Sequence, residues 1–175
     1  MPQTFASAGI PADADTVWRT LRDFGGLATW QPAVARGVLR PDDAPDRIGG
    51  VRTLLMADGG TVVETLVALD DGERSLTYDI VSSPYPVRDY RATMRVLPLT
   101  ATGEAFVGWS AVFDCAPSDA DGLAESFRDV IFAAGLRALA EHLSPGRTAD
   151  ESVTASSAGP GVLGRAATGP GRSRS

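Results

Sequence analysis

The sequence predicts one α+β domain, in which an antiparallel sheet packs against a long carboxy-terminal helix. Apolar and polar residues alternate with a period of two in several short segments between residues 51 and 114, which is typical of half-buried strands. Gly, Pro and Asp residues separate these segments, as expected for turns. After Ala116-Pro117 the pattern changes to helical spacing, with an apolar stripe at Leu123, Phe127, Val130, Ile131, Ala134 and Ala138.

The chain begins with a predicted strand followed by two short helices. Residues 3–9 alternate weakly, and Asp13 precedes a helix that we expect over residues 14–23. Gly25-Gly26 interrupts that helix. Residues 27–30 can form one further turn before the next proline stops it.

A predicted hairpin follows a second strand at residues 33–40 and a Pro- and Asp-rich loop at residues 41–48. The hairpin strands are residues 51–56 and 61–69, which are rich in Val, Leu, Thr and Met. Between them lies Asp58-Gly59-Gly60, which is typical of a tight hairpin turn.

Glu64 is the one carboxylate in the middle of this otherwise apolar hairpin, and the strand register decides where it points. We expect Asp58-Gly59-Gly60 to be a three-residue loop, which pairs Leu54 with Glu64 and Arg52 with Leu66. A two-residue loop would move every side chain to the opposite face. The three-residue loop is favoured because it surrounds Glu64 with one apolar face, made of Leu54, Met56, Val62, Leu66 and Ala68.

Three more strands and the long helix complete the predicted order. The strands are residues 76–81, 88–97 and 104–114, and two prolines hold a loop at residues 82–86 between the first two of them. The helix is expected over about residues 119–143, which is long enough to cross a whole sheet.

Composition indicates one folded domain at residues 1–143 and excludes several classes of protein. The chain has 175 residues, 43% of them hydrophobic, and a mean hydropathy of −0.02, which is ordinary for a globular domain. Its net charge of −6 argues against a nucleic-acid or anionic-membrane surface. The segment 144–175 is rich in Gly, Ser, Ala and Arg, and we expect it to be disordered.

The cellular setting is predicted from what the sequence lacks. A single cysteine, Cys115, allows no internal disulfide. The amino terminus has no signal-peptide pattern, and no apolar stretch is long enough for a membrane span. We therefore expect a cytoplasmic protein without membrane insertion.

Several local motifs resemble the polyketide cyclase/dehydrase branch of the START-like (SRPBCC) superfamily. They are residues 17–24 (VWRTLRDF), Trp30, residues 49–52 (GGVR), residues 63–66 (VETL) with Leu69-Asp70-Asp71, and residues 86–91 (PVRDYR). The same motifs are similar to those of the plant abscisic-acid receptors. This resemblance extends over residues 3–143.

The resemblance implies the helix-grip fold, a curved seven-stranded antiparallel sheet around the long helix with a deep, mostly apolar cavity between them. It also implies that Glu64, Tyr90 and Trp109 face this cavity. The loops at residues 57–60 and 83–87 correspond to the receptors' gate and latch but lack their Ser-Gly-Leu-Pro-Ala and His-Arg-Leu motifs. Gln31 stands where those receptors carry a ligand-binding lysine, so hormone recognition does not transfer.

The residue types around Glu64 suit proton transfer. A buried carboxylate without a partner has a raised pKa, and such a group can act as general acid or base near neutral pH. Tyr78 and Tyr90, on neighbouring strands of the same face, could stabilise a developing negative charge. We expect a cofactor-free cyclisation, dehydration or isomerisation of a small hydrophobic or aromatic, polyketide-like substrate.

Three alternatives stay open at this point. Glu64 could instead form a structural ion pair with Arg52. The domain could be a non-catalytic binding or carrier protein for a lipid, polyketide or other small apolar ligand. It could also be a partner-binding adaptor without a cavity.

The predicted ligand-binding residues surround these catalytic candidates. Without the family resemblance, aromatic residues on such a face are more often core residues. Tyr85 could be an exposed loop residue or a lid, and Gly135 could open space or allow close packing. The set is Trp30, Gln31, Arg52, Leu54, Met56, Leu66, Ile80, Tyr85, Trp109, Phe127, Ile131 and Gly135.

No residue pattern in the sequence predicts a cofactor or a metal site. His142 lies in the last turn of the long helix, where a favourable helix-dipole contact explains it. The expected partner is a small hydrophobic molecule, with no nucleic acid, and the protein is expected to be a monomer or homodimer.

Overall fold

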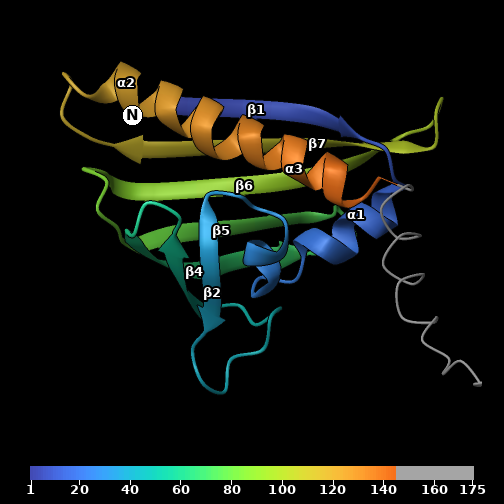
Figure 1. Ribbon diagram of the computed structural model, residues 1–175, viewed down its shortest axis with the longest axis horizontal. Coiled ribbons are helices and arrows are strands. Elements are labelled where there is room, and N and C mark those ends of the chain that lie inside the picture. The colour runs from blue at the N-terminus through green and yellow to red at the C-terminus, as the bar shows by residue number, and fades with distance from the viewer. Residues whose placement is uncertain (145–175) are drawn as a thin grey trace, which may run out of the picture.

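The computed structural model describes residues 1–144, and these form a curved seven-stranded antiparallel sheet that packs against a long helix (Figure 1). The predicted α+β class and the helix-grip architecture are confirmed. The segment predicted to be disordered is 144–175, and residues 145–175 of it lie outside the described residues. The elements in chain order are β1 (Gln3–Ile10), α1 (Ala14–Leu21), η1 (Gly26–Thr29), β2 (Val34–Leu39), β3 (Val51–Met56), β4 (Thr61–Asp70), β5 (Ser75–Ser82), β6 (Arg88–Leu99), β7 (Glu104–Asp114), α2 (Ala120–Ser126), η2 (Phe127–Ala133) and α3 (Ala134–His142).

The sheet order β1-β7-β6-β5-β4-β3-β2 places the first strand beside the last. The long helix runs along the sheet over β1 and β7 (Figure 1). Alternate residues of the central strands are buried toward it, as the period of two predicts. On β7 these are Ala105, Val107, Trp109, Ala111 and Phe113.

The two short helices after β1 are present, although both boundaries differ slightly from those expected. Asp13 caps α1, because its carboxylate accepts a hydrogen bond of 2.9 Å from the Thr16 backbone N–H. The helix ends at Leu21, two residues before the predicted end. The second helix, η1, is a single 3₁₀ turn, a common form for a short connector.

The hairpin register differs by two residues from the expected one. The loop is 57–59, because the Met56 N–H donates to the Gly60 carbonyl at 2.8 Å. Gly59 takes the left-handed conformation, with φ +90°, which closes a three-residue hairpin loop. Arg52 therefore pairs with Glu64 instead of Leu66, and Leu54 pairs with Val62. A shift of two leaves every side chain on its predicted face.

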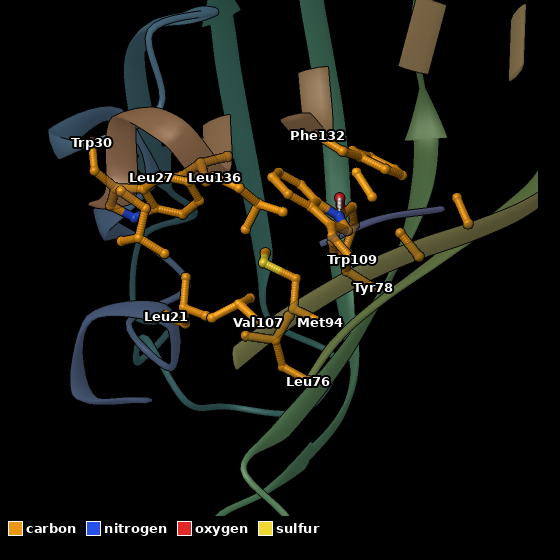
Figure 2. Close-up of a cluster of buried hydrophobic side chains, with 14 of the residues drawn as sticks. Leu21, Leu27, Trp30, Leu76, Tyr78, Met94, Val107, Trp109, Phe132 and Leu136 are labelled. Carbon is orange, nitrogen blue, oxygen red and sulfur yellow. Dashed lines mark hydrogen bonds between the residues drawn. The ribbon is translucent and has the colours of Figure 1, made fainter. Parts of the chain in front are cut away.

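The long helix is continuous, but its middle is a π-helix. Phe127 and Phe132 are five residues apart and both are buried, as the wider turn allows. Val130, expected on the buried stripe, is instead 60% exposed. The expected stripe was wrong at this residue because the wider turn rotates it away from the sheet. Phe132 stacks on Trp109 with ring centroids 4.5 Å apart (Figure 2).

Candidate functional site

A narrow cavity lies between the long helix, the η1–β2 corner and the inner face of the sheet. The centres of water molecules could occupy a volume of about 40 Å³ in it. This is room for only a few water molecules. The wall is mostly apolar. It consists of Leu27, Gln31, Ala33, Val34, Leu54, Met56, Val62, Glu64, Tyr78, Ile80, Tyr85, Tyr90, Trp109, Phe127 and Ile131.

Most of the predicted site residues meet in this wall, and four do not. Trp30 packs edge-on against Trp109, with ring centroids 6.2 Å apart, and stays outside the wall. Leu66 is 1% exposed within the hydrophobic core. Arg52 and Gly135 are buried but do not belong to the wall.

Sequence reasoning missed four wall residues. Val62 lies two positions before Glu64 on β4, so the period of two predicts its face correctly, but the pattern does not show that it lines the cavity. Leu27, Ala33 and Val34 come from the η1–β2 corner. Their contribution depends on how this corner folds back over the sheet, for which the local pattern carries no signal.

Glu64 is not a lone acid. Its Oε2 accepts a hydrogen bond of 2.6 Å from Arg52 Nε, and both side chains are buried. The alternative of an ion pair with Arg52 is therefore confirmed, and the premise of an unpartnered carboxylate is wrong. The direct cross-strand pairing of Arg52 with Glu64 brings the two together.

Arg52 is fixed from several sides. Its Nη1 donates to the Phe24 carbonyl oxygen at 2.7 Å. Its guanidinium carbon lies 3.9 Å from the centre of the Phe24 ring and 5.3 Å from that of Tyr78, in cation–π geometry. The guanidinium thereby holds the Glu64 carboxylate in place from behind the cavity wall.

Two tyrosines, Tyr78 and Tyr90, belong to the same cavity wall as Glu64. Trp109 Nε1 donates to the Tyr78 hydroxyl at 3.1 Å (Figure 2), which leaves the proton of that hydroxyl free to be donated. Burial, and secondarily the charge of Glu64, raises the pKa of Tyr78. Burial also raises the pKa of Tyr90 well above its ordinary value. Both phenols are therefore protonated donors at neutral pH.

Gln31 connects the cavity to the π-helical turn. Its Nε2 donates to the Ile131 carbonyl at 3.0 Å, and its Oε1 accepts from the Ala33 N–H at 3.2 Å. A Cβ at residue 135 would lie 3.0 Å from Gln31 Cδ and closer still to Nε2. Gly135 therefore allows close packing of Gln31 on the helix, and it does not open space in the cavity.

Tyr85 stands at one side of the cavity, in the loop between β5 and β6. Its ring meets that of Phe127 edge-on, with centroids 5.4 Å apart. The Tyr85 side chain is partly buried and belongs to the cavity wall, so this aromatic residue is packed into the site instead of projecting freely from its loop. Burial also raises the pKa of Tyr85.

Two negative observations apply to residues 1–144. They contain no group of three or more His, Cys, Asp or Glu side chains placed to hold a metal ion. Over the same residues, no helix has the length and apolar character that crossing a membrane requires.

Residues 1–144 match the family described as "Polyketide cyclase / dehydrase and lipid transport". A solved Thermobifida fusca protein is 34% identical, with a TM-score of 0.73, and the match covers 81% of this chain and 93% of that one. The protein XoxI from Bacillus cereus is 31% identical, with a TM-score of 0.71, and 81% and 95% of the two chains are covered.

A more distant structure shares the fold. It is norcoclaurine synthase from Thalictrum flavum, solved in complex with dopamine and hydroxybenzaldehyde. Its identity to this chain is 17% and its TM-score is 0.65, with 80% of this chain and 84% of that one covered.

Proposed function

Since the chain belongs to the polyketide cyclase / dehydrase and lipid transport family, we propose that its cavity widens beyond the volume of a few water molecules found here to bind a small, mainly apolar molecule, and that it promotes a cofactor-free cyclisation or dehydration of it. The observation that supports this proposal is the meeting of a carboxylate and two protonated phenols at one end of an apolar cavity. Such a set supplies a base and hydrogen-bond donors without a cofactor.

The pairing with Arg52 changes the role that we assign to Glu64. A carboxylate whose charge is balanced by a guanidinium starts the reaction as a base. It would remove a proton from the carbon next to a substrate carbonyl, while Tyr78 or Tyr90 donates a hydrogen bond to the carbonyl oxygen. In a dehydration, the resulting enolate expels the β-hydroxyl group, which takes the proton back from Glu64 and leaves as water.

The second candidate is a binding or carrier protein without chemistry. It is favoured by the same ion pair, because Arg52 already occupies one oxygen of Glu64 and gives that residue a structural role. In this reading the carboxylate and the phenols orient a guest and move no proton.

Dehydration of a β-hydroxy ketone, 4-hydroxy-4-phenylbutan-2-one, separates the two candidates, because its enone product absorbs in the near ultraviolet. We expect the unaltered chain to accelerate the reaction over buffer. Glu64→Gln should lose about 10²- to 10⁴-fold of that acceleration, which is the usual contribution of general base catalysis. Tyr90→Phe should lose a smaller part.

Glu141→Gln is the matched control, because Glu141 is exposed on α3, away from the cavity wall. Circular dichroism of each variant checks that the fold is kept. Binding of the ketone without conversion by the unaltered chain would favour the carrier. Equal rates for Glu64→Gln and the control would rule out Glu64 as the base.

A further inference from the structure

Glu64 is the only charged side chain in the cavity wall formed by the described residues. The rest of the wall is aliphatic, aromatic or neutral and polar. The charges that a buried ligand would meet therefore depend on Glu64 and on whatever lies against it.

Arg52 already neutralises that charge. The Arg52 Nε to Glu64 Oε2 distance is 2.6 Å, and the two side chains are 3% and 7% exposed. Arg52 lies behind Glu64 and takes no part in the wall, so its guanidinium faces Phe24, Tyr78 and Glu64 instead of the cavity. The polar end of the cavity thus has no net charge.

The remaining polar groups of the wall are neutral. Both polar ends of the Gln31 amide are engaged by backbone groups of Ile131 and Ala33. Tyr78 and Tyr90 are protonated at neutral pH because burial raises the pKa of each phenol. These groups offer hydrogen-bond donors and acceptors, but no counter-ion.

We propose that the cavity selects neutral ligands that carry a hydroxyl or carbonyl group, and that it rejects molecules whose polar end is a carboxylate or an ammonium ion. A charged end would lose its hydration in an apolar cavity without gaining an unpaired counter-charge, which is costly. A hydroxyl group can instead donate to Glu64 and accept from a tyrosine. This inference rests on the proposed function, since it specifies the ligand class of the same cavity.

Three probes of nearly equal shape test the selectivity: 2-phenylethanol, 2-phenylethylammonium and phenylacetate. Each is titrated into the full unaltered chain at pH 7 by calorimetry. We expect 2-phenylethanol to bind at least about tenfold more tightly than either ion, because desolvation opposes the binding of both ions.

Glu64→Gln provides a second measurement. Without the carboxylate, Arg52 has no counter-charge, so phenylacetate should gain affinity relative to 2-phenylethanol, by about tenfold or more. Glu141→Gln, which changes an exposed carboxylate of α3, should leave the preference as it is in the unaltered chain. The comparison among probes within the unaltered chain does not depend on the stability of either variant.

The outcomes distinguish this inference from the proposed function. Binding of phenylacetate or 2-phenylethylammonium as tightly as 2-phenylethanol would overturn the selectivity and leave the small-molecule cavity standing. Tight binding of phenylacetate in particular would show that the guanidinium of Arg52 is reachable. Failure of all three probes to bind would overturn the proposed binding cavity itself, and the selectivity with it.

Discussion

At the scale of single residues, the stability of the site depends on the buried ion pair between Arg52 and Glu64. Bringing two charges out of water is costly, and their attraction repays this cost only when the geometry is good. Here the pair has a direct hydrogen bond, a second bond from Arg52 to the Phe24 carbonyl and an aromatic ring against the guanidinium. Within residues 1–144, Arg52 Nη2 has no hydrogen-bond partner, so part of the cost remains.

Replacing Arg52 by methionine should destabilise the protein strongly. The change leaves the Glu64 carboxylate buried without a partner, which typically costs about 3–5 kcal/mol. Urea unfolding followed by circular dichroism gives the free energy of unfolding. Glu141→Gln is the control, and it should lie within about 0.5 kcal/mol of the unaltered chain, as is usual for surface changes.

The double variant Arg52→Met with Glu64→Leu completes the test. Removing both charges should recover most of the lost stability, because no uncompensated ion remains. A double variant as unstable as the sum of the two single variants would show that the pair contributes through packing, and that its charges matter little.

The period of two explains which residues of the site could be predicted. It placed Glu64 and Tyr78 on one face of the sheet, because strand alternation depends only on local sequence. That Trp109 faces the same cavity was implied by the family resemblance. Whether Glu64 was a lone acid or paired with Arg52 depended on the hairpin register. A shift of two residues keeps the faces but changes the neighbours, so the pattern could not decide between these readings.

At the scale of secondary-structure elements, the π-helical turn of the long helix is joined to the η1–β2 corner. Gly135 meets the Gln31 side chain, whose amide bonds to the Ile131 carbonyl within the π-helical turn. This contact joins the helix to the corner between η1 and β2, which supplies wall residues of the cavity. The π-helical turn itself was not predicted, because widening one turn leaves no distinct residue signature.

Gly135→Ala should destabilise the protein by about 1–3 kcal/mol, the usual cost of overpacking. The new methyl group would displace the Gln31 amide and break its bond to Ile131. Gly122→Ala is the matched control, because a Cβ there meets nothing within 4 Å. It should stabilise the helix by about 0.4–1 kcal/mol.

Chemical denaturation of both variants checks the sign of each change. A Gly135→Ala variant as stable as Gly122→Ala would mean that Gln31 moves aside without loss. In that case the amide would not be the link between the helix and the η1–β2 corner.

The loop between β2 and β3 is held by Asp43, whose side chain is 1% exposed. Its carboxylate accepts a hydrogen bond of 2.9 Å from the Val51 N–H and forms ion pairs with Arg40 and Arg47. The Val51 backbone bond, and then the Arg40 hydrogen bond, lower the pKa of Asp43 below its ordinary value of 3.8. The folded state therefore binds this proton less readily than the unfolded chain does.

Because folding lowers the pKa of Asp43, its contribution to the free energy of unfolding decreases as the pH falls. The contribution of Asp43 to stability is complete above the unfolded pKa and is lost as the pH falls through the folded pKa. Asp43→Asn should therefore be less stable than the unaltered chain at pH 7, and the difference should shrink below about pH 4. Urea unfolding of both proteins at pH 7, 4 and 3 measures this difference, and a gap independent of pH would contradict the assignment.

For the whole molecule, one hydrophobic core connects the sheet to the long helix and surrounds the cavity. Fully buried residues of this core come from β1, α1, β7 and the helix, including Ile10, Val17, Phe113 and Phe132. The overall fold was predictable because strand alternation, turn residues and helical spacing agree with one another along the chain. The narrow volume of the cavity was not, because it depends on how Tyr85, Phe127 and the η1–β2 corner pack together.

The predicted domain boundary can be tested by shortening the chain. The described core lies within residues 1–144, and we propose that residues 145–175, which are rich in Gly, Ser, Ala and Arg, are not needed for it. A chain ending at Ser144 should therefore keep its melting temperature within about 2 °C, since even 1 kcal/mol shifts it by roughly 2–4 °C at this size. Its affinity for 2-phenylethanol should also match that of the full chain. Calorimetry measures both quantities, and a larger drop in either would show that residues after 144 contribute to the fold or to the cavity.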